Sequence, residues 1–220
     1  VMKERKGISE GITSVQVCPM TREMVDEVSR VHIQAFKGSM NTRLGSSYVR
    51  KFLDWFVQLE AGIVLVAISK TNDHEEVVGY TVGAPIDYGK AMNRDLFWIA
   101  CWNTIIRPWL FLSDQFRDTI KSRLVALFQR STDQAFQVDL PLPVMSVVGV
   151  AVLPNFQGQS IGQELLCAFE AQARHLQVRS LRLSVYPENL GARRVYEKCC
   201  WLPALDSISP GRAMFYYKIL

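Results

Sequence analysis

The stretch VVGVAVLPNFQGQSIGQELL, residues 147–166, decides the fold of this chain. It begins with a run of β-branched and small apolar residues typical of a buried strand, and Pro154 ends that run. A turn with Gly158 and Gly162 follows, and a helical pattern opens directly from it. Such a turn presents backbone N–H groups and the positive helix end to an anion. On spacing alone, it is either a phosphate cradle or an ordinary connection whose glycines relieve backbone strain.

Strands and helices alternate on both sides of this stretch, which predicts an α/β layered architecture with at least one parallel crossover. The predicted strands cover residues 13–18, 63–69, 77–84, 144–153, 180–186 and 213–219. The predicted helices cover residues 22–36, 46–61, 161–176 and 189–199. The charged turn at 72–76 joins two of the strands into a hairpin.

Residues 88–137 interrupt this rhythm and are predicted to be a two-helix insertion. Its first part, LFWIACWNTIIRPWLFL at residues 96–112, is strongly apolar. It is 17 residues long and contains Asn103, Arg107 and Pro108, whereas a membrane span needs about 20 apolar residues. We therefore expect a helix buried within the protein and no membrane span.

The aromatic side chains of this insertion are expected to be covered, because a soluble helix pair would not leave so many of them in water. We predict that Trp98, Trp102 and Trp109 are mainly buried, packed against the sheet or a second subunit and walling a substrate cleft. The alternative left open is contact with a membrane surface.

Composition excludes several classes of protein. Of the 220 residues, 49% are hydrophobic and 21% charged, which is globular usage and excludes global disorder. The net charge of +4 comes from basic residues spread along the chain, so nucleic acid is not an expected partner. The five cysteines show no zinc-ligand or disulfide spacing, and residues 1–12 have no apolar signal segment. We expect a cytoplasmic protein with no metal.

Two motifs give a more specific reading. Gln157-Gly158-Gln159-Ser160-Ile161-Gly162 resembles the Q/R-x-x-G-x-G/A signature of the GCN5-related N-acetyltransferase (GNAT) superfamily. About 35 residues later, NLGARRVYEK at residues 189–198 resembles the N-x-x-A-x-x-h-Y-E-K helix of that family, where h is apolar. The two motifs stand in the expected order, separated by a helix and a strand. The resemblance is strongest over residues 144–201 and fails over the insertion.

The resemblance implies a single acetyltransferase domain over residues 1–220, with the helical, aromatic-rich insertion at about 88–137. It implies a mixed, mostly antiparallel central sheet flanked by helices. It also implies that the cofactor is acetyl-CoA (CoA). The implied cofactor-binding residues are Val150 and Val152 through their main chain, the turn residues Gln157, Gly158, Gln159, Ser160, Ile161 and Gly162, and the helix residues Asn189 and Tyr196.

The sequence departs from the family pattern at two turns. Ser160 stands where the family usually has Gly, which places a side chain beside the expected pyrophosphate. Cys200-Trp201 stands where Gly-Phe usually ends the second motif, and a non-glycine residue is strained in the left-handed conformation of such a helix end.

The expected chemistry is acetyl transfer to the primary amine of a small molecule by direct attack in a ternary complex. A phenol is protonated at neutral pH, so Tyr196 is the predicted general acid for the departing thiolate. The strand at 144–153 holds no Glu, Asp or His, and His32 is the candidate base, with a water-relayed deprotonation as the alternative. The alternative functions are an acyltransferase for a longer acyl chain or lipid-linked acceptor, or a non-catalytic CoA-binding module. A homodimer is left open.

Overall fold

The computed structural model describes residues 14–70, 74–107, 138–204 and 213–220. One seven-stranded sheet forms its centre, in the order β1-β2-β3-β4-β5-β7-β6. Every neighbouring pair is antiparallel except β4 and β5, which run parallel. The strands are β1 (Ser14–Pro19), β2 (Ile63–Lys70), β3 (Glu75–Pro85), β4 (Val144–Val152), β5 (Ser180–Val185), β6 (Leu202–Pro203) and β7 (Met214–Ile219). The predicted fold class is confirmed.

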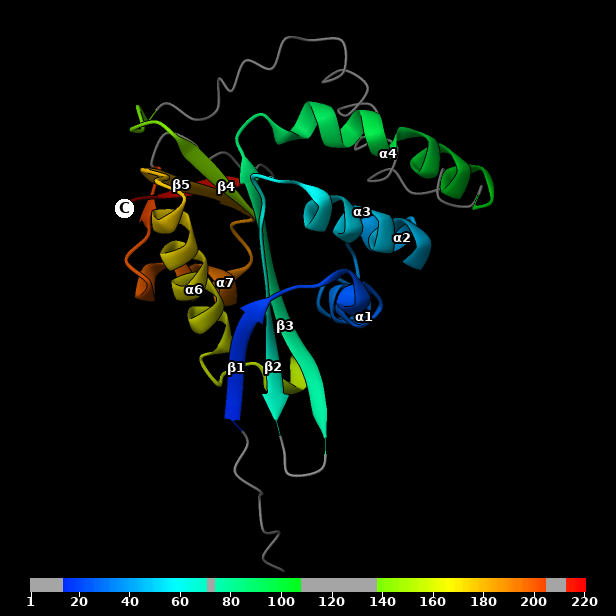
Figure 1. Ribbon diagram of the computed structural model, residues 1–220, viewed down its shortest axis with the longest axis horizontal. Helices are drawn as coiled ribbons and strands as arrows, with labels where there is room; N and C mark the ends of the chain where they lie inside the picture. The colour runs from blue at the N-terminus through cyan, green and yellow to red at the C-terminus, as the bar shows by residue number, and fades with distance from the viewer. Residues whose placement is uncertain (1–13, 71–73, 108–137, 205–212) are drawn as a thin grey trace, which may run out of the picture.

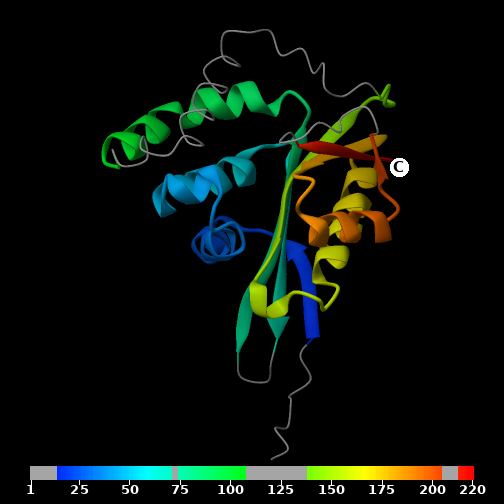
Figure 2. The same cartoon turned by 180° about the vertical axis from the view of Figure 1, so that it is seen from behind.

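Helices cover the sheet on both sides (Figure 1). The short helices α2 (Met40–Arg43) and η1 (Arg22–Met24) accompany α1 (Val25–Ala35) and α3 (Ser46–Gln58) on one side. On the opposite face of the sheet, α6 (Ile161–His175) contacts α7 (Leu190–Lys198), and the reverse view shows both helices on that side (Figure 2). The short helix η3 (Pro154–Phe156) follows β4.

The core lies on both faces of the central strands, whose β-branched residues favour a pleated, buried surface. On the far face, Phe169 of α6 is fully buried and lies over Gly83 of β3. A Cβ atom at Gly83 would overlap the Phe169 ring, so glycine is what allows the helix to approach the sheet closely.

Helix α4 (Tyr88–Ile105) forms the first part of the predicted insertion and lies against α3 (Figure 1). The rest of the predicted insertion, residues 108–137, lies outside the described residues. Within the described residues, no helix combines the length and the hydropathy that crossing a membrane requires.

The prediction that the insertion's tryptophans are buried is wrong for two of them. The side chains of Trp98 and Trp102 are 78% and 62% exposed, and Trp109 lies outside the described residues. The inward face of α4 instead holds Leu96 and Asn103, both buried. Trp98 and Trp102 do share one side of the helix, but it is the side opposite to Leu96 and Asn103.

Hydrogen bonds explain why the polar residue Asn103 faces inward. Its Oδ1 accepts hydrogen bonds from Ser47 Oγ of α3 and from the Arg107 guanidinium, each at 2.8 Å. The same guanidinium donates to the Leu44 carbonyl at 2.9 Å. These bonds satisfy a buried amide and tie the end of α4 to the connection between α2 and α3.

Candidate functional site

The candidate site lies where β4 separates from β5. The two strands pair only from Val144 to Val147 of β4, whereas β4 remains paired with β3 up to Val152. The register of β3 and β4 shifts at Val82/Gly83, which leaves Val148 as the extra residue of a β-bulge. A cleft of about 490 Å³ lies beside this edge of β4, lined also by the loop after β4, by α7 and by the end of α1.

The unpaired edge of β4 presents main-chain groups to the cleft. In an antiparallel ladder, alternate residues bond to the neighbouring strand. Leu153 N–H donates to the Val78 carbonyl at 2.8 Å, so the main-chain groups of Ala151, two residues earlier, also face β3. The N–H and C=O groups of Val150 and Val152 therefore point the other way, where β5 has already separated. The Val152 carbonyl accepts a hydrogen bond from Gln157 Nε2 at 3.1 Å.

The loop between β4 and α6 has a backbone suited to binding an anion. Gly158 has φ +83° and Ser160, the N-cap of α6, has φ +64°. Ser160 makes no side-chain capping bond, and its carbonyl accepts from the N–H groups of Gln163 and Glu164. The first N–H groups of a helix have no partner within it, so those of Ile161 and Gly162 are available to a ligand.

The left-handed backbone at Ser160 explains the family's preference for glycine there. A non-glycine residue in this conformation is strained by about 1 kcal/mol or more. The conformation is nevertheless kept, and it turns the chain from β4 into α6 with Gly158 and Ser160 lining the cleft. Serine at this position therefore adds backbone strain to the turn but does not change the course of the chain.

Helix α7 forms the opposite wall of the cleft. The Asn189 side chain caps the helix by accepting from Ala192 N–H at 3.2 Å. Two turns later, Tyr196 lies against the cleft with only 8% of its surface exposed. Burial raises the pKa of Tyr196 to about 12, so its hydroxyl is protonated at neutral pH. A protonated phenol at a cleft wall can donate a proton or a hydrogen bond.

The end of α7 is a complete Schellman turn, although Cys200 replaces glycine. Cys200 has φ +60°, and its N–H donates to the Glu197 carbonyl at 3.0 Å. Trp201 N–H donates to the Tyr196 carbonyl at the same distance, and the rings of these two residues have centroids 6.3 Å apart. The departure from the family pattern at this position therefore leaves the helix end intact.

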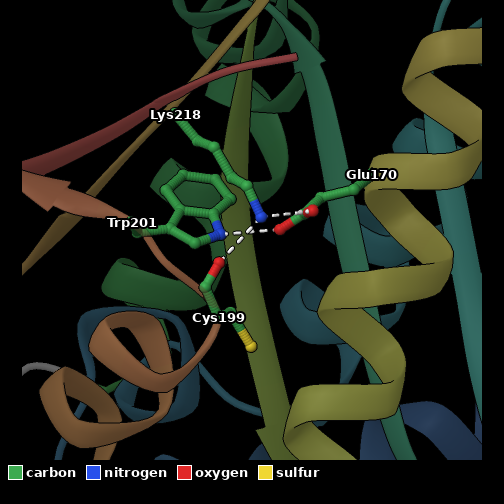
Figure 3. A network of polar contacts seen from close by, with 4 residues as sticks. All are labelled: Glu170, Cys199, Trp201 and Lys218. Atoms are coloured by element: carbon green, nitrogen blue, oxygen red, sulfur yellow. Dashed lines mark hydrogen bonds and ion pairs between the residues drawn. The ribbon is translucent and has the colours of Figure 1, made fainter.

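A buried polar network fixes this turn to α6 and β7 (Figure 3). Glu170 of α6 accepts from Trp201 Nε1 at 2.9 Å and from Lys218 Nζ at 2.6 Å. Lys218 Nζ also donates to the Cys199 carbonyl at 2.7 Å. The bonds of Trp201 to the buried Glu170 and of Lys218 to the Cys199 carbonyl resist displacement of the end of α7, which carries Tyr196.

His32 lies behind the cleft and does not line it. It is buried in α1, where its Nδ1 lies 2.5 Å from the Tyr80 hydroxyl and its ring contacts those of Phe36 and Phe52. Burial lowers the pKa of His32 to about 4, so the imidazole is neutral at pH 7 and a weak base. The predicted role of His32 as catalytic base has no support from this position.

The cleft brings together most residues that the motifs predicted. Those that line it are Val150, Val152, Gln157, Gly158, Ser160, Ile161, Gly162, Asn189 and Tyr196. Gln159 is exposed and does not line it. The sequence reasoning missed Arg194 and Lys198, which helical spacing from Gly191 could have found, and Phe36, for which the sequence gives no signal.

Comparison with known sequences agrees with the motifs. Residues 124–200 match the model of the acetyltransferase (GNAT) family. Among curated proteins, no relative matches this sequence.

Solved structures share the fold at low sequence identity. PaiA N-acetyltransferase from Thermoplasma acidophilum, solved in complex with coenzyme A, is 11% identical, with a TM-score of 0.55 over 94% of this chain and 99% of that one. A GNAT-family acetyltransferase from Staphylococcus aureus Mu50 is 12% identical, with a TM-score of 0.56 over the same shares of the two chains. YncA, a putative acetyltransferase from Salmonella typhimurium solved with acetyl-CoA, is 15% identical, with a TM-score of 0.54 over 94% of each chain.

The class of protein follows from the sheet, the cleft and these matches. The chain has the GNAT fold, and the resemblance inferred from its two motifs is confirmed. Its residues 124–200 carry the sequence pattern of the GNAT acetyltransferases, and this range includes the edge of β4, the loop after it and the whole of α7.

The buried His32 predicts acid sensitivity of the fold. Its pKa is about 4 in the folded protein and near 6.5 in the unfolded chain, so below pH 6.5 the unfolded chain binds the extra proton. The stability present above pH 6.5 should fall by about 3 kcal/mol as pH drops to 4, most of it by pH 5. Urea unfolding across this range measures the loss.

His32→Gln should remove this part of the pH dependence, whereas His175→Gln, at an exposed position of α6, should leave it unchanged. An identical pH profile in the wild type and the His32 variant would show that His32 is not buried in its neutral form.

Proposed function

We propose that this protein is an acetyl-CoA-dependent N-acetyltransferase that acts on the primary amine of a small molecule. The observation that carries the proposal is the cleft between β4 and α7, where the edge of β4 and the loop before α6 both offer main-chain hydrogen-bonding groups. The edge of β4 offers the N–H and C=O groups of an unpaired strand. The loop before α6 offers N–H groups with no partner in the helix.

The residues of the cleft fit a CoA thioester. The pantetheine arm carries amides, which can pair with the main chain of Val150 and Val152 as an additional strand would. The pyrophosphate suits the N–H groups of the loop from Gly158 to Gly162. Two solved structures of this fold contain coenzyme A or acetyl-CoA, which supports the same cofactor here.

Tyr196 is proposed as the general acid. When bound, acetyl-CoA supplies a thioester carbonyl that a neutral amine attacks, releasing a thiolate. Tyr196 can protonate that thiolate because its hydroxyl stays protonated well above neutral pH and its side chain lines the cleft. The N–H group of Val150 or of Val152 is the proposed donor to the carbonyl oxygen.

No carboxylate or imidazole lines the cleft among the described residues, so the amine is proposed to lose its proton through water. The described residues of α4 do not line the cleft either, and Trp98 and Trp102 face away from the protein. Their apolar surface therefore gives no support to a longer acyl chain or a lipid-linked acceptor at this site. We retain a small amine as the proposed acceptor.

Cofactor binding can be tested at Gly162. A Cβ added there would lie 3.8 Å from Val195 and 3.9 Å from Val152, which are ordinary contacts, so Gly162→Ala should fold and bind CoA. Gly162→Asp adds negative charge beside the proposed pyrophosphate site and should abolish binding. Calorimetry and the CoA-dependent rise in melting temperature measure both variants. A wild-type protein that shows neither binding heat nor a thermal shift with saturating CoA would refute the proposed pyrophosphate site.

The general-acid role can be tested with Tyr196→Phe, which removes only the hydroxyl. CoA affinity should stay within about twofold, and turnover with a good amine acceptor should fall about 10²-fold. Tyr186→Phe is the matched control, because Tyr186 is exposed and outside the cleft. Equal turnover in both variants would make Tyr196 a packing residue.

A further inference from the structure

The cleft contains two cationic side chains and no carboxylate among the described residues that line it. They are Arg194 and Lys198, one helical turn apart on α7. Neither forms a hydrogen bond or an ion pair with another described residue. Glu197, the nearest carboxylate on the helix, does not line the cleft and accepts a hydrogen bond from the Tyr216 hydroxyl, so the two cations favour an anionic ligand at this wall.

The neighbouring Arg193 shows that this arrangement is specific to the cleft-facing side of α7. Its guanidinium donates to the Pro187 carbonyl at 3.1 Å and to the Tyr216 hydroxyl at 3.4 Å, and it does not line the cleft. Arg193 therefore has a structural use within the fold. The side chains of Arg194 and Lys198 have no such use in the described residues.

Helix packing places these cations near the proposed pyrophosphate loop but on the other wall. Val195, next to Arg194, comes within 3.8 Å of the point where a Cβ of Gly162 would lie. The loop itself, Gln157 to Gln163, carries no charged side chain and offers only neutral donors. The cleft thus has two separate features for binding anions, an uncharged main-chain loop and a cationic pair.

Coenzyme A carries two separate anionic groups that match this division. One is the pyrophosphate, and the other is the 3′-phosphate of its ribose, which carries close to two negative charges at pH 7. Charge-assisted bonds from guanidinium and ammonium groups are the strong form of phosphate recognition. We propose that Arg194 and Lys198 bind the 3′-phosphate and make the site selective for CoA over dephospho-CoA. This inference rests on the proposed function.

The test compares the affinities of CoA and dephospho-CoA, which differ only in that phosphate. The wild type should bind CoA at least about tenfold more tightly. Arg194→Ala/Lys198→Ala should lose about tenfold or more in CoA affinity and less than about twofold in dephospho-CoA affinity, so that the two ligands bind almost equally. Dephospho-CoA binding also shows that the variant is folded.

The matched control is Arg30→Ala/Arg174→Ala, which removes the same charge from exposed positions outside the cleft and should keep the discrimination. Equal affinity of the wild type for both ligands would overturn the inference and leave the proposed function standing. An equal loss of both ligands in the α7 variant would also overturn it. Binding of neither ligand to the wild type would refute the proposed function itself.

Discussion

The separation of β4 from β5 after Val147 is the constraint on which the site depends. While two strands stay paired, their N–H and C=O groups bond to each other and offer nothing to a ligand. The bulge at Val148 changes which residues of β4 direct their N–H and C=O groups toward β3. Because β5 has separated, the N–H and C=O groups of Val150 and Val152 have no partner strand. A ligand with amide groups can then satisfy a strand edge that would otherwise need water.

Each of the two helices beside the cleft has one residue with a strained, left-handed backbone at one of its ends. Ser160 and Cys200 both have positive φ, one at the start of α6 and the other after the end of α7. In each case the surrounding hydrogen bonds hold the turn that glycine would make without strain. At Cys200, the network of Glu170, Lys218 and Trp201 adds buried, charge-assisted bonds to that turn (Figure 3).

Local patterns predicted the parts of the structure that local physics determines. The run of valines, Pro154 and the glycine turn identified β4, the loop and α6, and the 189–198 motif identified α7. The helical spacing of Val25 and Val28 places His32 on the apolar, buried face of α1. Its hydrogen-bond partner could not be predicted in this way, because Tyr80 is 48 residues away in the sequence.

Helix α4 shows the limit of periodicity as a guide. The pattern indicated a helix and a stripe of large apolar side chains, and both are present. It could not indicate that the covered face would be the one with the polar Asn103, because its partner Ser47 comes within reach only when the helix lies against α3. Burial of a polar residue is decided by its hydrogen bonds, and those are tertiary contacts.

Amide hydrogen exchange at Val150 and Val152, followed by NMR with and without CoA, tests the central claim most directly. If the free edge of β4 binds the pantetheine arm, these amides should exchange several-fold more slowly when CoA is bound. Amides of Met145 to Val147, where β4 is paired on both sides, serve as the reference. CoA binding that leaves the exchange of Val150 and Val152 unchanged would contradict the account.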